Sequence, residues 1–332
     1  MNNVNLRTIL NDYERKRIYE MNALENRKNE LYNQIPRLKQ IDSELSSSSI
    51  SVAKNLLKSN KPELLTELQK NIQSLKEEKK SILNSIGKDE SYLNIHYDCN
   101  LCKDTGYIIE GFKTIKCNCL KQKIFDLEYN KSNISNLSEQ NFSNFKSTVY
   151  SDVVDKEKYK SDISPRENIE IIKKICLNFI KNFDSKEEKN LLFTGNTGLG
   201  KTFLSSCIAN ELLKKGKTVL YQTAPVMFDT IIDYRFGKNT SNIYNNLLDV
   251  DLLIIDDLGT ESMNNMKFSE LFNIINTRLL NQKNHCTKTI ISTNLSLQNL
   301  LHSYEERVVS RFVGNYNICR FFGNDIRFIK NN

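Results

Sequence analysis

A glycine-rich loop between two regular segments constrains the fold of this chain more than any other feature of its sequence. The apolar residues 191–193 before the loop predict a strand, and residues 203–213 after it predict a helix. The loop has the pattern G-x-x-x-x-G-K-T, which in this strand–loop–helix context is the P-loop motif. Its residues are Gly195, Asn196, Thr197, Gly198, Leu199, Gly200, Lys201 and Thr202.

The residues of this loop have the chemistry of a phosphate site. Glycine lets the backbone fold back so that successive N–H groups point inward, where the N-terminus of the following helix adds a positive dipole. Lys201 is expected to neutralise the outer phosphates, and Thr202 is expected to hold the Mg²⁺ that bridges them. The alternative is a glycine turn with an incidental lysine. In its context the motif predicts binding of a nucleoside triphosphate.

A second apolar run, residues 252–255, ends in two carboxylates, Asp256 and Asp257. Its apolar residues do not alternate with polar ones, which predicts a strand that is covered on both faces, as in a parallel sheet. Asp256 is expected to bind Mg²⁺, directly or through water. Asp257 follows at the position where an acid can polarise the attacking water. The alternative for Asp257 is a cap of the turn before Gly259.

Two further segments carry candidate catalytic residues. Asn294 follows the β-branched run 289–293, where a polar side chain can orient water near the γ-phosphate. Ordinary turn chemistry is the alternative, since Asn is common after strands. Arg307 and Arg311 lie four residues apart and therefore on one face of a predicted helix. On pattern alone they are equally compatible with a solvated helix face.

The regular alternation of strands and helices in the C-terminal part predicts an α/β fold. Parallel strands with helices on both faces are the expected arrangement. One strand lies between the P-loop and the Asp-Asp strand, which is typical of the ASCE class of P-loop ATPases. The five strands are expected at residues 191–194, 218–223, 252–255, 289–293 and 316–321.

The first 90 residues predict amphipathic helices with charged outer faces. Pro36 is expected to kink or break the first helix, and Pro62 to begin a later long one. A serine-rich break is expected at residues 46–49, so that the two long helices form an antiparallel hairpin. The hairpin is either a stalk that buries its own stripe or a module that binds a partner. Its apolar stripe repeats every seven residues at Leu24, Leu31, Leu38 and Leu45.

Four of the eight cysteines lie close together, as a C-x₂-C pair and a C-x-C pair at the ends of a predicted hairpin. Four thiolates enclose Zn²⁺ tetrahedrally, and a closed site of this kind stabilises a segment that has little core. The predicted zinc ligands are Cys99, Cys102, Cys117 and Cys119, with His96 as an alternative ligand. The other four cysteines, which lie on apolar patterns and are expected in the core, are Cys176, Cys207, Cys286 and Cys319.

Length and charge set broader limits. A chain of 332 residues is long enough for about two domains. The net charge of +7 is spread thinly, so no segment is a basic arm that would indicate nucleic-acid binding. No signal peptide and no apolar run of about 18 residues is evident. A soluble, cytoplasmic protein with reduced cysteines is expected.

These motifs together resemble the bacterial replicative-helicase loaders of the DnaC/DnaI type, and most of all the DnaI-like branch with an N-terminal zinc module. The resemblance is carried by the P-loop, by L-I-I-D-D-L-G at residues 253–259, by S-T-N at 292–294 and by E-R-V-V-S-R-F at 306–312. The helical N-terminus and the two cysteine pairs extend it over the whole chain. Insertion-sequence helper ATPases of the IstB type share the core motifs.

The resemblance implies a plan of three regions. A helicase-interaction region would cover residues 1–90, and a zinc-binding module with a linker helix would cover 91–134. An AAA+ ATPase domain without a full helical lid would cover residues 135–332. ATP, Mg²⁺ and Zn²⁺ are the implied cofactors.

The resemblance also implies roles for individual residues. Asp257 would polarise the attacking water, Asn294 would be sensor 1, and Arg311 would reach into the ATP of a neighbouring subunit, with Arg307 as second candidate. AAA+ proteins usually have Glu where this chain has Asp257, so slow hydrolysis, stimulated by DNA or a partner, is expected. Residues that could contact DNA are Phe228, Tyr234, Arg235 and Phe236, with core packing as an equal alternative for the aromatic residues. Phe142 and Phe145 are candidates for the adenine pocket.

The implied partners are the hexameric replicative DNA helicase, single-stranded DNA and neighbouring copies of the ATPase domain, with no membrane. The implied function is ATP-dependent delivery of the helicase to single-stranded DNA in replication initiation. The alternative is an IstB-type transposition helper ATPase that acts on duplex DNA. A third hypothesis is a nucleotide-dependent adaptor that does not hydrolyse ATP.

Overall fold

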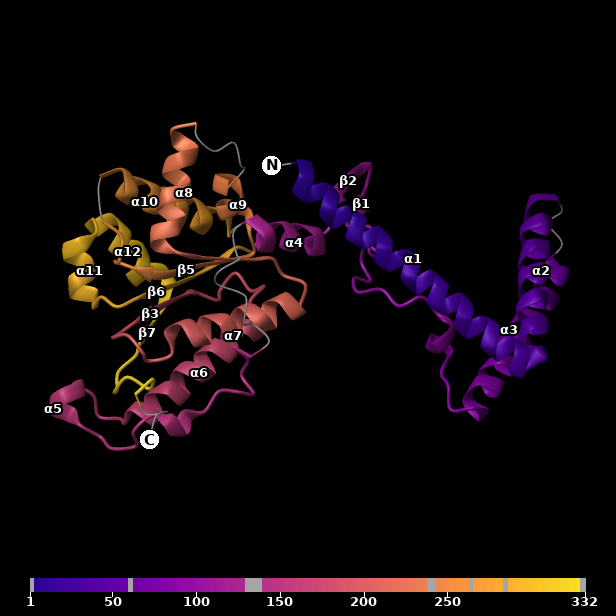
Figure 1. The fold of residues 1–332 in the computed structure, drawn as a ribbon, viewed down its shortest axis with the longest axis horizontal. Coiled ribbons are helices and arrows are strands. Elements are labelled where there is room, and N and C mark those ends of the chain that lie inside the picture. The colour runs from indigo at the N-terminus through magenta and orange to yellow at the C-terminus, as the bar shows by residue number, and fades with distance from the viewer. Residues whose placement is uncertain are drawn as a thin grey trace. The chain divides into compact units, whose positions relative to one another are not determined.

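The computed structural model describes residues 3–58, 62–128, 139–237, 243–262, 265–282 and 286–328 (Figure 1). The chain divides into two compact units. One consists of Leu10–Ile108, and the other of Met1–Ile9 together with Ile109–Asn332. The three functional regions 1–90, 91–134 and 135–332 stay a prediction, and the boundary at 134 lies outside the described residues.

A five-stranded parallel sheet organises the larger unit and confirms the predicted fold class. The P-loop strand β3 and the Asp-Asp strand β5 do not pair, because β6 lies between them. The strand order is β4-β5-β6-β3-β7. The strands are β3 (Asn190–Thr194), β4 (Val219–Thr223), β5 (Leu252–Leu258), β6 (Lys288–Thr293) and β7 (Tyr316–Arg320).

Helices cover both faces of this sheet, as Figure 1 shows. Alternate residues of each strand enter opposite cores, so that Leu253 and Ile255 of β5 face one core while Leu252 and Ile254 face the other. The first face carries α8 (Ala224–Arg235), α9 (Ile243–Asp249), α10 (Asn265–Asn281) and α12 (Glu306–Asn315). The second carries α6 (Pro165–Lys181) and α7 (Lys201–Lys214). Shorter elements are η2 (Ser147–Val149), α5 (Lys156–Tyr159) and α11 (Leu297–Ser303).

One buried arginine joins three elements at the amino ends of β5 and β6. The side chain of Arg278, on α10, is 1% exposed. Its guanidinium donates to the carbonyl oxygens of Leu247 at 2.8 Å, Val250 at 2.9 Å and Lys288 at 2.7 Å. Burial lowers its pKa to about 10. These carbonyls lie at the end of α9 and beside two strands. Without Arg278 they would be buried without a hydrogen-bond donor.

Helix α4 (Asn118–Glu128) covers an edge of the sheet, at strand β4. The side-chain amide of Gln122 pairs with both backbone groups of Val219, accepting from its N–H at 2.7 Å and donating to its carbonyl at 3.0 Å. Phe125 is buried in the core between β4 and α8, and Asn118 donates to the carbonyl of Gly216. An uncovered edge strand would offer its backbone to other chains, so α4 protects this one.

The smaller unit is helical. Helix α1 (Asn3–Gln34) ends just before Ile35, and Pro36 begins α2 (Pro36–Lys58), as the sequence predicts. Helix α3 (Pro62–Ser85) begins at the expected proline and packs on α2, with ion pairs Arg37–Glu78 and Asp42–Lys79 between them. A short helix η1 (Glu90–Leu93) follows. The small core consists of Leu31, Leu38, Leu83 and Leu93.

The predicted break at residues 46–49 is wrong. These serines lie inside the continuous helix α2. The hydroxyl of Ser46 donates to the carbonyl of Asp42 at 2.9 Å, and that of Ser47 donates to the carbonyl of Glu44 at 2.9 Å. Serine hydroxyls that bond back to the preceding turn are compatible with a continuous helix.

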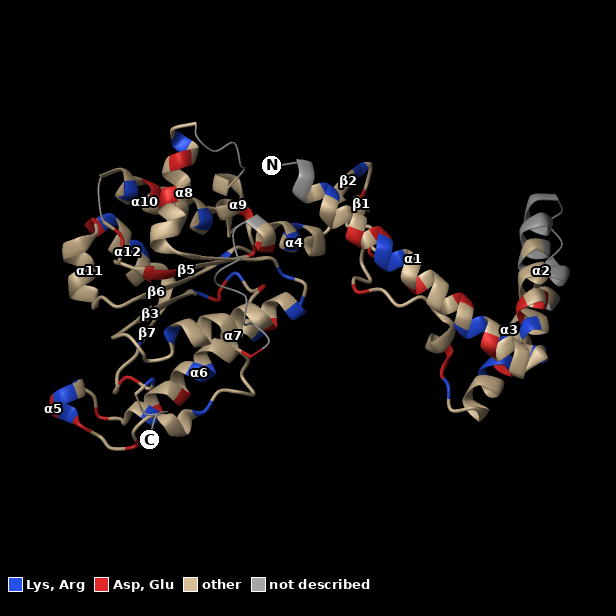
Figure 2. Ribbon diagram, in the orientation of Figure 1, with Lys and Arg blue, Asp and Glu red and all other residues tan. Residues whose placement is uncertain are grey.

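Among the described residues, no helix has both the length and the apolar character that crossing a membrane requires. The charged residues are distributed over the helices of both units (Figure 2).

Candidate nucleotide-binding site and cysteine cluster

The P-loop connects β3 to α7 at the carboxyl edge of the sheet. Three of its glycines have positive φ angles, which are 137° at Gly195, 71° at Gly198 and 87° at Gly200. Each is also in close contact with another part of the chain. A Cβ atom would lie 2.2 Å from the carbonyl oxygen of Phe321 at Gly195, and 2.0 Å from the carboxylate carbon of Asp325 at Gly198. Glycine is therefore required at Gly195 by conformation and by space, whereas at Gly198 the backbone conformation favours glycine and a Cβ would force the Asp325 side chain to move.

Segments that are distant in the sequence hold the loop in place. The phenol of Tyr150 donates to the carbonyl of Leu199 at 3.0 Å, from the side of α6. The N–H of Ile326 donates to the carbonyl of Gly198 at 3.0 Å. We call residues 321–327 the C-terminal strap, because they follow β7 and pack against the P-loop. Tyr150 and the strap are contacts that the sequence did not predict, since no local pattern marks them.

Lys201 is buried at the centre of the site, with 5% of its surface exposed. Its ammonium donates to the carbonyls of Gly195 at 2.6 Å and Asn196 at 2.7 Å, and to Oδ1 of Asn294 at 2.8 Å. Burial lowers the pKa of Lys201 to about 8, against the opposing effect of the nearby Asp257 and Asp256. The structure thus brings Asn294, at the end of β6, to the predicted phosphate-binding lysine.

The carboxylate of Asp256 is the most densely bonded group of the site. Its Oδ2 accepts from the hydroxyl of Thr202 at 3.0 Å and from the phenol of Tyr221 at 2.6 Å. Its Oδ1 accepts from the hydroxyl of Ser292 and from the N–H of Asp257 at 3.1 Å. Thr202 and Asp256 place two oxygen atoms side by side, and oxygen atoms are the ligands that Mg²⁺ prefers. Tyr221 and Ser292 were not predicted.

Asp257 differs from its neighbour in backbone and environment. It is a non-glycine residue with a φ of +55°, in the left-handed region that Asp enters more easily than most residues. Burial and the charge of Asp256 raise the pKa of Asp257, while Lys201 opposes the shift. A carboxylate with a raised pKa is a better proton acceptor, which fits the predicted role beside an attacking water.

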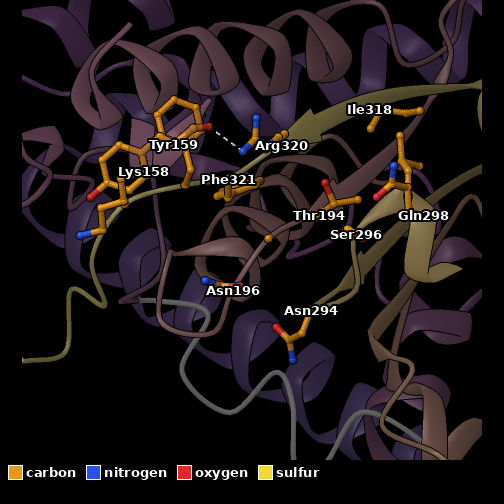
Figure 3. A pocket seen from close by; sticks show the side chains of 14 residues that line it. Lys158, Tyr159, Thr194, Asn196, Asn294, Ser296, Gln298, Ile318, Arg320 and Phe321 are labelled. Atoms are coloured by element: carbon orange, nitrogen blue, oxygen red, sulfur yellow. Dashed lines mark hydrogen bonds between the residues drawn. The ribbon is translucent and has the colours of Figure 1, made fainter. Parts of the chain in front are cut away.

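Figure 3 shows a cavity of about 450 Å³ beside the P-loop, at the carboxyl ends of β3, β6 and β7. Asn196 and Asn294 line it on the side of the P-loop. Arg320 lines it on the side of β7 and donates to the carbonyl of Tyr159 at 2.7 Å. Both asparagines also accept hydrogen bonds from Lys201, Asn196 through its carbonyl and Asn294 through its side chain.

The two candidate arginine fingers stack on one aromatic ring. The guanidinium of Arg307 lies 4.6 Å from the ring centre of Phe272 on α10, and that of Arg311 lies 5.9 Å from it. Arg307 also pairs with Glu305, and Nε of Arg311 donates to Oδ1 of Asn276 at 3.2 Å. The side chains are held in this position by α10, and their action on a neighbouring subunit stays a prediction.

A buried acid links the loop after Asp257 to the start of this arginine helix. Glu261 is 8% exposed and accepts from the N–H of Gly259 at 2.9 Å. The phenol of Tyr304, two residues before α12, donates to the same carboxylate. The sequence did not predict this pair, because its members lie far apart in the chain.

The residues implied for DNA and adenine contact lie in different environments. Phe228 is 1% exposed in the core, so of its two alternatives the structure shows core packing and not DNA contact. Arg235 is paired with Glu270, and Tyr234 stacks on Tyr244. Phe236 is exposed. Phe145 packs against Phe203, directly after Thr202, with ring centres 6.3 Å apart, and Phe142 packs on the same core.

The predicted zinc ligands come together around the hairpin of β1 (Tyr107–Glu110) and β2 (Lys113–Lys116). The sulfur atoms of Cys99, Cys102, Cys117 and Cys119 all lie within 4.8 Å of one another. In a tetrahedral site with Zn–S bonds of about 2.3 Å, sulfur atoms lie roughly 3.8 Å apart. The four thiols therefore fit Zn²⁺. The group of ligand atoms does not include His96.

The loop of the first cysteine pair is held by a buried acid that the sequence did not predict. Asp104 is 3% exposed and accepts from the N–H groups of Asp98 and Cys99, each at 2.9 Å. The N–H of Gly106 donates to the sulfur of Cys102 at 3.3 Å. A donor of this kind favours the thiolate form, which is the form that binds metal.

The remaining cysteines confirm a core role for three of four. Cys176, Cys207 and Cys319 are buried, whereas Cys286 is only half-buried. Burial raises the pKa of Cys207 and of Cys319 to about 12, so both stay thiols at neutral pH.

The strand order and the P-loop with its paired acids define an ATP-binding domain of the AAA+ class. The chain belongs to the family of IstB-like ATP binding proteins, whose model matches residues 142–311, just over half of the chain. This family match confirms the resemblance of the ATPase core, whose motifs the helicase loaders and the IstB-type ATPases share.

The chain is also similar to proteins of known name. The replicative helicase loader DnaC of Escherichia coli K12 is 30% identical over 135 residues, which are 40% of this chain and 53% of that protein. DnaC of Buchnera aphidicola subsp. Baizongia pistaciae is 31% identical over 142 residues, 42% of this chain and 54% of that protein. The match thus spans about half the length of these relatives.

Solved structures are similar to about half of the chain, at lower identity. A crystal structure of the DnaC helicase loader is 25% identical, with a TM-score of 0.40, over 47% of this chain and 90% of that chain. A crystal structure of DnaI is 23% identical, with a TM-score of 0.42, over 51% of this chain and 88% of that chain.

Two glycine substitutions separate the space requirement at Gly198 from its backbone conformation. Gly198 and Gly216 have φ angles of 71° and 76°, but a Cβ at Gly216 has nothing within 4 Å. Each change to Ala carries a left-handed strain of about 1 kcal/mol. Only Gly198→Ala also displaces Asp325 and the strap. We expect it to weaken binding of a fluorescent ATP analogue by about tenfold or more, a change of about 1.4 kcal/mol.

The matched control Gly216→Ala should bind the analogue as the unmodified protein does, with a similar loss of thermal stability from strain. Equal affinities for the two variants would contradict the role of the strap contact.

The lowered pKa of Lys201 predicts a pH-dependent affinity. Below about pH 8 the ammonium is charged and attracts phosphate, and above it the charge is lost. The dissociation constant for ATP should therefore rise as the pH increases through 8, approaching about tenfold per pH unit at most. Titration with the fluorescent analogue on both sides of this pH measures the effect. Lys201→Met should bind weakly without this dependence, and a flat profile in the unmodified protein would contradict the prediction.

The cysteine cluster predicts about one Zn²⁺ per chain. Cys117→Ser should lower the zinc content measured by elemental analysis and reduce the unfolding temperature, because metal binding and folding are coupled. Cys286→Ser changes a thiol outside the cluster and should keep the metal. Zinc-free protein that unfolds at the same temperature as the zinc-loaded form would disprove a structural role.

Proposed function

We propose that this protein is an ATP-dependent loader, which binds the hexameric replicative DNA helicase and delivers it to single-stranded DNA during replication initiation. The observation that carries the proposal is the 30% identity to a replicative helicase loader, DnaC, over 135 residues. The site geometry supports it, since the P-loop and the ends of β5 and β6 form a nucleotide site with its lysine, hydroxyl and paired acids together.

The ATP cycle follows from the positions of the site residues. The N–H groups of the P-loop and Lys201 would bind the phosphates, and Thr202 and Asp256 would hold Mg²⁺, which neutralises charge that develops on the phosphates. Asp257 would accept the proton of the attacking water. Asn294, which is bonded to Lys201, would be the polar residue that orients this water. Asp is one methylene shorter than Glu, so we propose slow hydrolysis that DNA or a partner stimulates.

A neighbouring copy of the ATPase domain would complete the site. Arg311, supported by Asn276 and Phe272, would contribute its guanidinium to the ATP of the next subunit, with Arg307 as second candidate. An arginine supplied from outside stabilises the charge of the transferring phosphate. ATP would then hold copies of the protein together, and hydrolysis would release them.

The N-terminal parts of the chain would supply the helicase contact. Residues 1–90 and the cysteine module in residues 91–134 precede the family-matched region, which begins at residue 142. We propose that they dock on the helicase, and that Zn²⁺ stabilises the fold of the module. The names of the curated relatives favour this function over a transposition helper that acts on duplex DNA.

Loading onto circular single-stranded DNA tests the proposal, because a closed helicase ring has no DNA end to thread. The full-length protein with the cognate replicative helicase and ATP should place helicase on the circle, measured by co-sedimentation after a salt wash. Lys201→Ala should reduce loading by about tenfold or more, since it removes the buried phosphate-binding cation.

Lys189→Ala is the matched control, because it removes an exposed lysine immediately before β3. It should load helicase as the unmodified protein does. Absence of any complex between the full-length protein and the helicase would refute the loader, and ATP-dependent filaments on duplex DNA in its place would favour the transposition helper.

A further inference from the structure

The phenol of Tyr221 lies at the predicted magnesium site although no motif includes it. Tyr221 is on β4, the edge strand next to β5, and pairs with Ile254 in the strand register. Asp256 comes two residues after Ile254, so both side chains lie on the same face of the sheet. The phenol oxygen is 2.6 Å from Oδ2 of Asp256.

Four donors share the two oxygens of this carboxylate, two on each. A carboxylate offers about four acceptor positions, and the one on Oδ2 that accepts from Thr202 is the one that Mg²⁺ would use. Thr202 and Tyr221 both donate to Oδ2, but their predicted roles toward Mg²⁺ differ. The hydroxyl of Thr202 is the predicted ligand of Mg²⁺. The phenol of Tyr221 donates to the carboxylate and is not a predicted ligand of Mg²⁺.

The environment of Tyr221 keeps it in this role. The residue is 1% exposed and packs in the core beneath α6 and α7. This packing fixes the ring, so that the hydroxyl stays directed at Oδ2 of Asp256. A short hydrogen bond to a charged acceptor, fixed by a packed ring, restricts the rotation of the carboxylate.

We propose that Tyr221 is a positioning residue for Mg²⁺, which holds Oδ2 of Asp256 beside the Thr202 hydroxyl so that the two form one preorganised oxygen site. The inference rests on the nucleotide binding in the proposed function and not on the helicase. Partners that orient a metal ligand commonly contribute tenfold or more to metal affinity. Tyr221 therefore sets the Mg²⁺ concentration at which the site binds its nucleotide.

A purely structural role makes a different prediction. A buried phenol needs an acceptor, and Asp256 would merely satisfy it. In that case loss of the hydroxyl would change the stability of the fold but not the response of the site to Mg²⁺. The Mg²⁺ dependence of nucleotide binding distinguishes the two roles.

The test uses Tyr221→Phe in the full-length protein, which keeps the ring and removes the hydroxyl. Binding of a fluorescent ATP analogue is titrated with Mg²⁺ at a fixed analogue concentration. We expect the half-saturating Mg²⁺ concentration to rise by about tenfold. Binding of a fluorescent ADP analogue in excess EDTA should stay within about twofold of the unmodified protein, a difference under about 0.4 kcal/mol.

Tyr316→Phe is the matched control. Tyr316 is also buried, on β7, and lies at the amino end of its strand, opposite Asn190. Its loss of a hydroxyl should leave the Mg²⁺ titration unchanged. Thermal unfolding of both variants shows whether the fold is kept.

An unchanged or lower half-saturating Mg²⁺ concentration in Tyr221→Phe would overturn the proposal, as would an equal shift in Tyr316→Phe. Unmodified protein that binds no nucleotide would overturn both this inference and the proposed function. A protein that binds nucleotide with the predicted Tyr221 effect but loads no helicase would refute only the loader.

Discussion

The carboxylate of Asp256 is the group on which the geometry of the nucleotide site depends. Its four donors come from β5 itself, from α7 through Thr202, from β4 through Tyr221 and from β6 through Ser292. Three adjacent strands and the P-loop helix thus meet at one charge. A buried carboxylate that accepts from four donors is stable only in this arrangement, so the carboxyl edge of the sheet is held as a unit.

The P-loop is held from its other side by parts of the chain that surround the family's motifs. Tyr150 contacts the loop before α6 begins, and the C-terminal strap contacts it after β7 ends. The strap lies against Gly195 and Gly198, where any side chain would collide. Residues 321–327 therefore form a wall against the P-loop. This arrangement explains why glycine is favoured there for packing as well as for anion binding.

Sequence patterns were sufficient where structure depends on neighbours along the chain. Buried strands appear as apolar runs, and the P-loop is a local motif, so all five strands and the cluster of Lys201, Thr202, Asp256 and Asn294 were predicted. The serine run at 46–49 was misjudged because hydroxyls can bond back to their own helix. For Phe228 the sequence left DNA contact and core packing open, because its pattern suits both, and the structure shows core packing.

The sequence by itself determined the fold class, the phosphate loop, the paired acids and the four thiols, since each is encoded in residues close together in the chain. Tertiary structure alone decided the roles of Tyr221, Ser292, Tyr150, Asp104 and the strap. Their partners, with the exception of those of Asp104, lie on strands or segments far away in the sequence. Hydrogen bonds and close packing act over a few ångströms, and only folding brings such residues within that distance.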